Sequence, residues 1–381
     1  MKKLLIFLFI FFAFQFIFAQ KVLAIENPAS LPNNKFGIHI LFTGELEDAA
    51  KLINSNGGDW GYVTIPIQSG EKDLEKWQKF MDDARNLHII PIIRLASEGD
   101  FFNTRVWRKP NIYDILDFAN FLNSLDWPTK NRYVIVFNET NRADEWGGKS
   151  NPSEYAQILS YAVTVFKSKS HDFFIISAGL DNAAENSNDS YNQYDYLRQM
   201  NSAVPGIFYQ IDGIGSHSYP NPGFSQPPNV LTAKSISSFK FEKNLIQSLS
   251  SKDLPVFITE TGWSHQKIKK ELIGEYYKTA FSSVWNDASV VAVTPFLLKA
   301  GTDPFLQFSF IENDSSTPQY TAFQNIKKEE GRPGLTEKVL GEKMKSRPLE
   351  TLSFNVESDV ANDFSMSIPL KNFFKLLLGL R

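Results

Sequence analysis

The sequence predicts a (β/α)8 barrel, or TIM barrel, with a short C-terminal extension. Eight short apolar runs alternate with stretches of helical spacing, and several runs, among them Ile89–Ala96 and Phe173–Leu180, are β-branched or aromatic at consecutive positions. Such runs are typical of parallel strands that are buried on both faces. Eight strand–helix units in sequence favour a closed barrel over an open doubly wound sheet.

The elements follow one another in a regular order. The predicted strands are Phe36–Leu41, Tyr62–Ile67, Ile89–Ala96, Tyr133–Glu139, Phe173–Leu180, Ile211–Tyr219, Val256–Trp263 and Val290–Leu298. Apolar residues at helical spacing predict the helices Leu74–Leu87, Tyr113–Leu125, Glu154–Phe166, Tyr194–Met200, Phe241–Leu249, Leu272–Trp285 and Tyr320–Ile326. No Gly-Ser linker and no repeated motif interrupts residues 33–330, so we expect a single TIM-barrel domain there.

Both ends of the chain differ from this pattern. Residues 1–24 combine Lys2 and Lys3 with a long apolar run and small-residue cleavage sites, which is typical of a secretory signal peptide; an uncleaved membrane anchor is the alternative. Residues 331–381 form the predicted extension, in which 352–356 and 364–368 could pair as a short hairpin. Its last residues place apolar side chains on one helical face, and this helix either docks onto the barrel or makes peripheral contact with a membrane.

Composition excludes several classes of function. The 381 residues carry 39 Lys and Arg against 42 Asp and Glu, a net charge of -3, so nucleic acid is not an expected partner. The chain has no cysteine, which excludes disulfides, thiolate nucleophiles and zinc ribbons. Its 5 histidines form no His-x-x-x-His pair, and no phosphate-binding glycine loop precedes a helix, so we expect neither a metal nor a cofactor.

Two carboxylates follow predicted strands at the end where a TIM barrel carries its chemistry. Glu139 follows Asn138 at the end of the fourth strand, and Glu260 ends the seventh strand within Ile-Thr-Glu-Thr-Gly-Trp. A carboxylate is costly to ionise in an apolar strand unless it opens onto a polar site. Two of them at separate strand ends can flank one substrate bond, as glycoside hydrolysis requires.

These residues resemble the TIM-barrel glycoside hydrolases of clan A over residues 33–330. The resemblance implies that Glu139 is the acid/base and Glu260 the nucleophile of a retaining enzyme. His217 and Tyr219 match the His-x-Tyr sequence of this clan, which lines the subsite next to the cleaved bond and orients the nucleophile. Asn138 precedes the acid/base as in the clan, and Arg94 is the weaker match to a substrate-site arginine.

Aromatic residues after the strands suit a carbohydrate ligand, because sugars present flat C–H faces to aromatic rings. Trp146 and Trp263 lie just past strands four and seven, so we expect them to contact substrate. Clan members often carry tryptophan at the end of strand eight, where this chain has Phe296. Phe296 either stacks on a sugar or belongs to the barrel core. The departure puts the identity of the sugar in doubt.

The sequence therefore predicts an exported, secreted or cell-envelope, retaining glycoside hydrolase that cleaves β-linked oligo- or polysaccharides. The Glu-Thr-Gly-Trp string resembles the β-1,3-glucanases, whereas Phe-Gly-Ile-His-Ile resembles the β-xylosidase group, so the clan is predicted and the family is not. The alternative is a non-catalytic carbohydrate-binding or envelope protein on the same scaffold. A general acid must hold a proton that a nucleophile must lack, so we also expect Glu139 to have the higher pKa of the pair.

Overall fold

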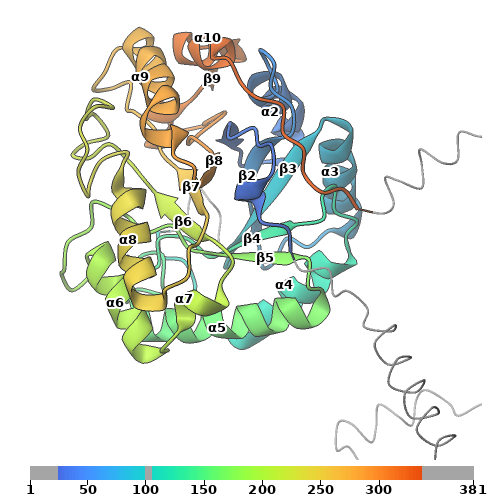
Figure 1. The fold of residues 1–381 in the computed structure, drawn as a ribbon, viewed down its shortest axis with the longest axis vertical. Helices are drawn as coiled ribbons and strands as arrows, with labels where there is room; N and C mark the ends of the chain where they lie inside the picture. The colour runs from blue at the N-terminus through green and yellow to red at the C-terminus, as the bar shows by residue number, and fades with distance from the viewer. Residues whose placement is uncertain (1–24, 99–104, 337–381) are drawn as a thin grey trace, which may run out of the picture. The chain divides into compact units, whose positions relative to one another are not determined.

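The computed structural model describes residues 25–98 and 105–336, and within them the eight predicted strands form a parallel barrel (Figure 1). Strands β1 to β5 pair in sequence order, as do β6 to β8, and all these pairs are parallel. Parallel bridges from Ile176 to Gly213 and from Phe36 to Val293 join the two sheets and close the ring. The fold class predicted from the sequence is confirmed. The strands are β1 (Gly37–His39), β2 (Gly61–Gln68), β3 (Ile89–Ala96), β4 (Arg132–Val136), β5 (Phe173–Ser177), β6 (Ile214–His217), β7 (Val256–Glu260) and β8 (Val290–Val293).

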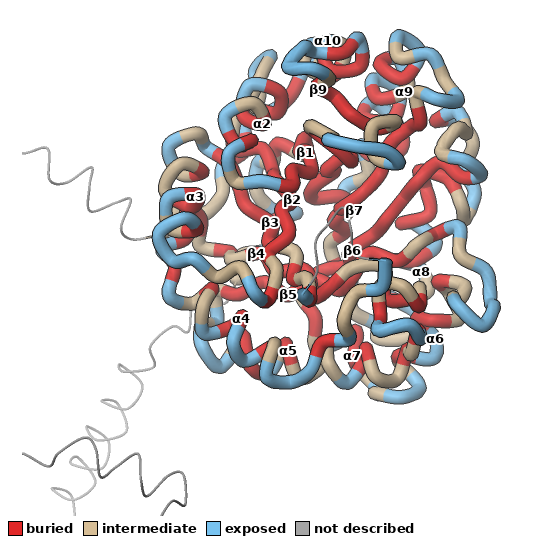
Figure 2. Tube along the Cα trace, turned by 180° about the vertical axis from the view of Figure 1, so that it is seen from behind, coloured by how far each residue is buried: buried red, intermediate tan, exposed pale blue. Residues whose placement is uncertain are grey.

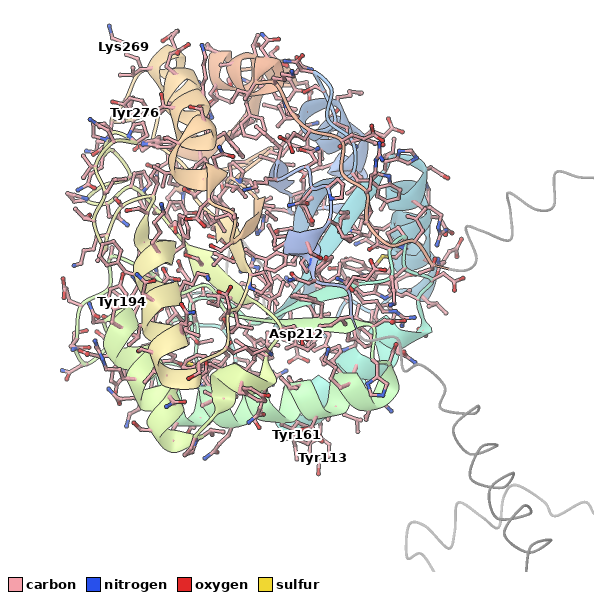
Figure 3. The ribbon with its side chains drawn as sticks, in the orientation of Figure 1. Tyr113, Tyr161, Tyr194, Asp212, Lys269 and Tyr276 are labelled. Carbon is pink, nitrogen blue, oxygen red and sulfur yellow. The ribbon has the colours of Figure 1, made fainter. Side chains whose placement is uncertain are left out.

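Helices surround the strands as an outer ring, and Figure 3 shows Tyr113 and Tyr161 on its outer side. Asparagine, aspartate or threonine caps several of them: Asn111, for example, accepts hydrogen bonds from the backbone N–H groups of Tyr113 and Asp114. The helices are α2 (Leu46–Ile53), α3 (Leu74–Asn86), α4 (Ile112–Ser124), α5 (Pro152–Lys169), α6 (Gln193–Ala203), α7 (Ile207–Gln210), α8 (Ser238–Ser250), α9 (Lys270–Ser282) and α10 (Pro318–Asn325). A small antiparallel hairpin and four 3-10 turns complete the described elements: β9 (Ile311–Glu312), β10 (Ser315–Ser316), η1 (Pro28–Ser30), η2 (Thr43–Glu45), η3 (Val284–Asn286) and η4 (Phe305–Phe308).

The core has an outer layer between strands and helices and an inner layer inside the barrel, and Figure 2 shows the barrel strands as mostly buried. Successive side chains of a strand point to opposite faces. In β3, Ile89 and Ile93 therefore join the outer layer, whereas Ile90 and Ile92 join the inner one. Arg94 continues the inner row, which directs its side chain toward the centre of the barrel near the end of the strand.

The chain continues past α10 along the N-terminal ends of the strands. Glu330 bridges to Asp59 beside β2, and Leu335 bridges to Thr129 beside β4. The extension predicted from residue 331 thus begins as a segment packed against the barrel. The predicted signal peptide, C-terminal hairpin and amphipathic helix lie outside the described residues. Within 25–98 and 105–336, no helix combines the length and apolar character needed to cross a membrane.

Candidate active site

Glu139 lies three residues beyond β4 on a strained backbone. Phe137 and Glu139 both have positive φ, 69° and 32°, a region that side-chain-bearing residues seldom occupy. The backbone N–H of Glu139 donates to the Gly179 carbonyl at 3.0 Å, and that of Arg142 donates to the Glu139 carbonyl at 2.8 Å. These bonds hold the turn against the end of β5. Such strain persists where the surrounding structure enforces it, and it is concentrated at functional sites.

Glu260 reaches the same place from β7 through a register shift. Ser216 pairs with Ile258, but the next residue of β6, His217, pairs with Glu260, so Thr259 is an extra residue in the ladder. Ile258 belongs to the outer core, and without this bulge Glu260 would share its face. The bulge instead turns the carboxylate toward the barrel mouth, where only 10% of the side chain is exposed.

His217 lies against both carboxylates, and Tyr219 contacts Glu260. The Nδ1 atom of His217 lies 2.9 Å from Oε1 of Glu139 and 3.7 Å from Oε2 of Glu260, while the Tyr219 hydroxyl donates to Glu260 Oε2 at 3.1 Å. Gly179 makes room for the imidazole, because a Cβ at that position would overlap the His217 ring. The structure thus brings together the His-x-Tyr sequence and the two glutamates that the sequence analysis selected.

Arg94 and His39 flank the other side of Glu260. Arg94 Nη1 lies 4.0 Å and His39 Nε2 lies 3.7 Å from Oε1 of Glu260. His39 is fully buried at the end of β1, and neither of its ring nitrogens has a hydrogen-bond partner among the described residues. Sequence reasoning missed His39 as a site residue. Its place at the end of the first strand was the available signal.

The two carboxylates are close to each other. One oxygen of Glu139, one ring nitrogen of His217 and one oxygen of Glu260 all lie within 4.8 Å of one another. In the described part of the chain this is the only group of three side chains with the spacing of metal ligands. Nδ1 of His217 already forms a hydrogen bond to Glu139 at 2.9 Å, whereas it lies 3.7 Å from Glu260.

The surroundings lower the pKa of Glu139 and raise the pKa of His217. Burial alone would raise the pKa of Glu139, but the hydrogen bond and charge of His217, together with Arg142 and Arg94, lower it overall. Burial lowers the pKa of His217, but the charges of Glu260 and Glu139 outweigh burial and raise it. Glu139 therefore lacks the raised pKa that a general acid leads one to expect, because cationic groups surround it before substrate is bound.

A second group of charged residues lies beside Glu139 and was not predicted. Arg142 Nη1 lies 3.4 Å from Glu139 Oε2 and 3.6 Å from Asp181 Oδ2, and its guanidinium pairs with Asp144. Burial, followed by the charge of Glu139, raises the pKa of Glu145 to about 8. These residues follow Asn138-Glu139 and the end of β5 directly, so their position after strands four and five was the available signal.

The structure corrects the expectation for two tryptophans. Trp146 is 1% exposed and packs against Phe137 and Tyr155, with its indole N–H directed at Glu154. Trp263 is also 1% exposed, because its ring packs into an aromatic cluster under α9 and its indole N–H donates to the Gln226 carbonyl. Neither ring has a face free to stack on a sugar in this structure.

Phe296 and Asn138 occupy intermediate positions. Phe296 is 8% exposed and meets His39 edge-on at 5.1 Å, and it belongs to an apolar cluster with Phe308 and Tyr219, the residue that donates to Glu260. It therefore packs in the barrel mouth next to the site. The buried side-chain oxygen of Asn138 has no hydrogen-bond partner among the described residues. A substrate hydroxyl could satisfy this oxygen.

Comparisons with known proteins place this geometry on a known fold. No family model matches the sequence, and no curated protein matches it significantly. A family 39 glycoside hydrolase from Bacteroides cellulosilyticus is similar in structure, with a TM-score of 0.55 and 16% identity; the match covers 79% of this chain and 64% of that one, less than two thirds of its length. A family 39 β-xylosidase from Caulobacter crescentus has a TM-score of 0.54 and 15% identity, covering 78% of this chain and 72% of that one.

A third similar structure comes from another glycoside hydrolase family. The GH5_18 protein from Streptomyces cattleya, solved with GlcNAc, has a TM-score of 0.54 and 13% identity, and the match covers 84% of this chain and 82% of that one. Families 39 and 5 both belong to clan A, the group that the sequence resembles. The chain thus has the (β/α)8-barrel fold of the clan A glycoside hydrolases.

Proposed function

We propose that this protein is a retaining glycoside hydrolase that cleaves β-linked glycans by double displacement. The observation that carries the proposal is the approach of Glu139 and Glu260, whose nearest oxygens lie within 4.8 Å of each other at the ends of β4 and β7. Retaining enzymes place their carboxyl groups about 5 to 5.5 Å apart, whereas inverting enzymes need roughly 6.5 to 9.5 Å to admit a water molecule. The nearest oxygens lie closer than the carboxyl groups as a whole, and their approach supports direct attack by one carboxylate.

In the proposed reaction, Glu260 attacks the anomeric carbon while Glu139 protonates the departing glycosidic oxygen. This forms a glycosyl ester on Glu260 and leaves Glu139 as a carboxylate. Glu139 then takes a proton from a water molecule, which attacks the same carbon and releases Glu260. The Tyr219 hydroxyl, at 3.1 Å from Glu260, and Arg94, at 4.0 Å, are placed to stabilise the carboxylate and orient it for attack.

The substrate class follows from the polar groups around the pair. Asn138 and His39 both present buried polar atoms without partners in the described structure, and hydroxyl groups of a sugar can satisfy them. The similar structures include a β-xylosidase and a protein solved with GlcNAc. We propose an oligo- or polysaccharide substrate on this basis.

Hydrolysis of a panel of aryl β-glycosides tests the function, and proton NMR of the first-formed anomer tests the stereochemistry. We expect release of nitrophenol from at least one β-glycoside and initial formation of the β-anomer. Initial formation of the α-anomer would contradict the retaining mechanism. Glycan binding without turnover of any β-glycoside or oligosaccharide would instead support the alternative of a non-catalytic carbohydrate-binding protein.

We also propose that the chain is exported, on the evidence of the signal-like residues 1–24. Expressed from its own start codon, the protein should be recovered outside the cytoplasmic membrane with an N-terminus near Gln20 or Ile25. N-terminal sequencing decides the point. An intact Met1 on membrane-bound protein would support the anchor.

A further inference from the structure

The two oxygens of the Glu139 carboxylate have different partners. Oε1 accepts from Nδ1 of His217 at 2.9 Å, and Oε2 faces Nη1 of Arg142 at 3.4 Å. Only 13% of the Glu139 side chain is exposed, so these two contacts define most of its environment. Arg142 thus holds the oxygen that His217 leaves free.

Arg142 is itself held by a forked ion pair. Its Nε lies 3.0 Å from Oδ1 of Asp144 and its Nη2 lies 2.6 Å from Oδ2, so two parallel hydrogen bonds fix the plane of the guanidinium. The third nitrogen, Nη1, is directed at Glu139 and, at 3.6 Å, at Oδ2 of Asp181. Asp144 therefore orients Arg142, and Arg142 in turn reaches Glu139.

The backbone around this network is also braced. The side chain of Asn141 accepts from the backbone N–H of Asp181 and donates to the carbonyls of Asp181 and Tyr191. Arg142 pairs with Ser190 in an isolated bridge. The loop after β4 is thus tied to the loop after β5, which keeps Arg142 at a constant distance from Glu139.

We propose that Arg142 is a positioning residue that holds Glu139 in the resting enzyme, and that Asp144 sets how strongly Arg142 acts on it. The inference rests on the proposed function, because it gives the acid/base role to Glu139. Neither Arg142 nor Asp144 is assigned a contact with the reacting atoms.

The charge of Arg142 favours the ionised form of Glu139 and so lowers its pKa. The other charged or titratable groups that face Glu139 come from every neighbouring strand end: Arg94 on β3, Glu145 in the same loop, Asp181 after β5, His217 and Tyr219 on or after β6, and Glu260 on β7. Replacing Arg142 by a neutral residue should therefore raise the pKa of Glu139. Replacing Asp144 should lower it, because a negative charge is lost and Arg142 is freed to approach Glu139.

The test is a pair of variants with opposed predicted effects. The alkaline limb of kcat/KM against pH reports the acid of the free enzyme. With Arg142→Met we expect this limb to move up by about 1 pH unit, the lower end of the effect of an adjacent opposite charge. With Asp144→Asn we expect a smaller shift downward. The alkaline limb of Arg142→Lys should lie between the limbs of Arg142→Met and the wild type.

The controls separate positioning from loss of structure. Arg198→Met removes an exposed arginine that pairs with Asp195 on α6, remote from the site, and should leave the pH profile unchanged. The Arg142 and Asp144 side chains are 39% and 44% exposed, so the variants should fold; if Arg142→Met does not, Arg142→Gln replaces it. Shifts in the same direction, or no shift in either folded variant, would overturn the proposal.

A measurement that needs no turnover keeps the two proposals distinguishable. Titration of the Glu139 carboxyl carbon by 13C NMR, assigned with Glu139→Gln, should show the same opposed shifts in Arg142→Met and Asp144→Asn. If no glycoside is hydrolysed but the shifts appear, the proposed function fails and the positioning role stands. If turnover is found but the Glu139 titration is unmoved in both variants, the positioning role fails alone.

Discussion

At the scale of single residues, Glu139 and Glu260 have different partners although they lie within 4.8 Å of each other. Glu139 is held between His217 and Arg142, whereas Glu260 accepts from Tyr219 and lies near Arg94 and His39. A carboxylate beside a hydroxyl donor and a cation is held in one orientation, which suits a nucleophile. Glu139 has the histidine partner through which a proton can be exchanged.

Removing either glutamate tests this difference in role. With Glu139→Ala, activated aryl glycosides should still glycosylate the enzyme, while poor leaving groups should lose roughly the 10²- to 10⁴-fold typical of general acid catalysis. Azide should restore turnover and give a β-glycosyl azide. With Glu260→Ala, both kinds of substrate should fail alike, and azide should give the α-azide. Product NMR distinguishes the two, and swapped products would reverse the assignment.

His39 offers a test in which activity and stability are expected to diverge. Its buried ring has two nitrogens without hydrogen-bond partners in the described structure, and burial lowers its pKa well below the usual range. Replacing an unsatisfied buried polar group by an apolar one is neutral or stabilising. His39→Leu should therefore leave the free energy of unfolding unchanged or higher, while kcat/KM falls through loss of a group 3.7 Å from Glu260.

Thermal unfolding and kinetics on one preparation of His39→Leu decide the matter. Val291→Ala, in the inner core, is the matched control, since removing two buried methyl groups there should lower stability with less effect on kcat/KM. If His39→Leu lost stability and kept full activity, His39 would be a packing residue.

At the scale of elements, β6 shows how one strand serves both the site and the core. His217 faces the glutamates, whereas Ser216 and Ser218, the residues on either side of it in the sequence, face α8. The Ser216 hydroxyl donates to Glu242 Oε1 at 3.1 Å, and the hydroxyls of Ser218 and Ser238 lie 2.9 Å apart. A carboxyl group that is 3% exposed thus lies directly behind the strand that carries His217 and Tyr219.

Burial raises the pKa of Glu242 to about 7, although hydrogen bonds from Ser216 and Ser238 partly oppose the shift. Glu242 therefore keeps its proton in the folded protein at pH values where it has already lost it in the unfolded chain. Its contribution to stability is fully present below its pKa in the unfolded chain. The contribution falls as pH rises from there and levels off above its pKa in the folded protein. Relative to Glu242→Gln, the wild type should lose about 3 kcal/mol of unfolding free energy across this range.

Denaturant unfolding of both proteins at several pH values between 4 and 8 measures the difference, and the contributions of other groups cancel in it. A constant difference across this range would mean that Glu242 titrates at its ordinary pKa. Glu271→Gln, on the outer surface of α9, serves as the control because it should leave the pH dependence unchanged.

At the scale of the whole molecule, barrel closure depends on contacts between the two ends of the domain. The bridge from Phe36 to Val293 joins β1 to β8, and α10 packs beside α2 at the same side of the ring (Figure 1). Lys328 is 3% exposed just past α10. Its Nζ lies 3.0 Å from each of four oxygens, the carbonyls of Phe323, Gln324 and Ile326 and the Ser55 hydroxyl, which share its hydrogen bonds. One side-chain amino group, whose pKa burial lowers to about 7, thus caps α10 and joins it to the turn after α2.

Lys328→Met keeps the length of the side chain but removes the donor. The Phe323 carbonyl still accepts from the backbone N–H of Ile326 and the Gln324 carbonyl from the Ser55 hydroxyl, so the Ile326 carbonyl is the one that loses its partner. A buried acceptor without a partner costs about 1 to 3 kcal/mol, so we expect a loss of that size in unfolding free energy, measured by denaturant titration. Lys278→Met, on the exposed face of α9, should change little. Equal stability of the Lys328 variant and the wild type would show that the loops close the ring without this residue.

The sequence alone was sufficient for the eight strands and for most helices, because strands buried on both faces and amphipathic helices carry strong local patterns. The two helices that it missed, α2 at Leu46–Ile53 and α7 at Ile207–Gln210, span only 8 and 4 residues, which is too short for a clear periodic pattern. The end of the fourth strand was predicted at Glu139, whereas β4 ends at Val136. The left-handed backbone at Phe137 and Glu139 is imposed by bonds to β5, which no local pattern reports.

For the site, the sequence selected Glu139 and Glu260 because residues at the ends of parallel strands converge on one face of a barrel, and the resemblance to clan A added His217, Tyr219 and Arg94. Only the tertiary structure decided how they meet: the bulge at Thr259 turns Glu260 inward, and Gly179 leaves space for His217. Only the tertiary structure, too, buried Trp146 and Trp263 and placed Arg142 against Glu139. Burial and ion pairing depend on which segments pack together, and residues far apart in the chain do not reveal this by their spacing.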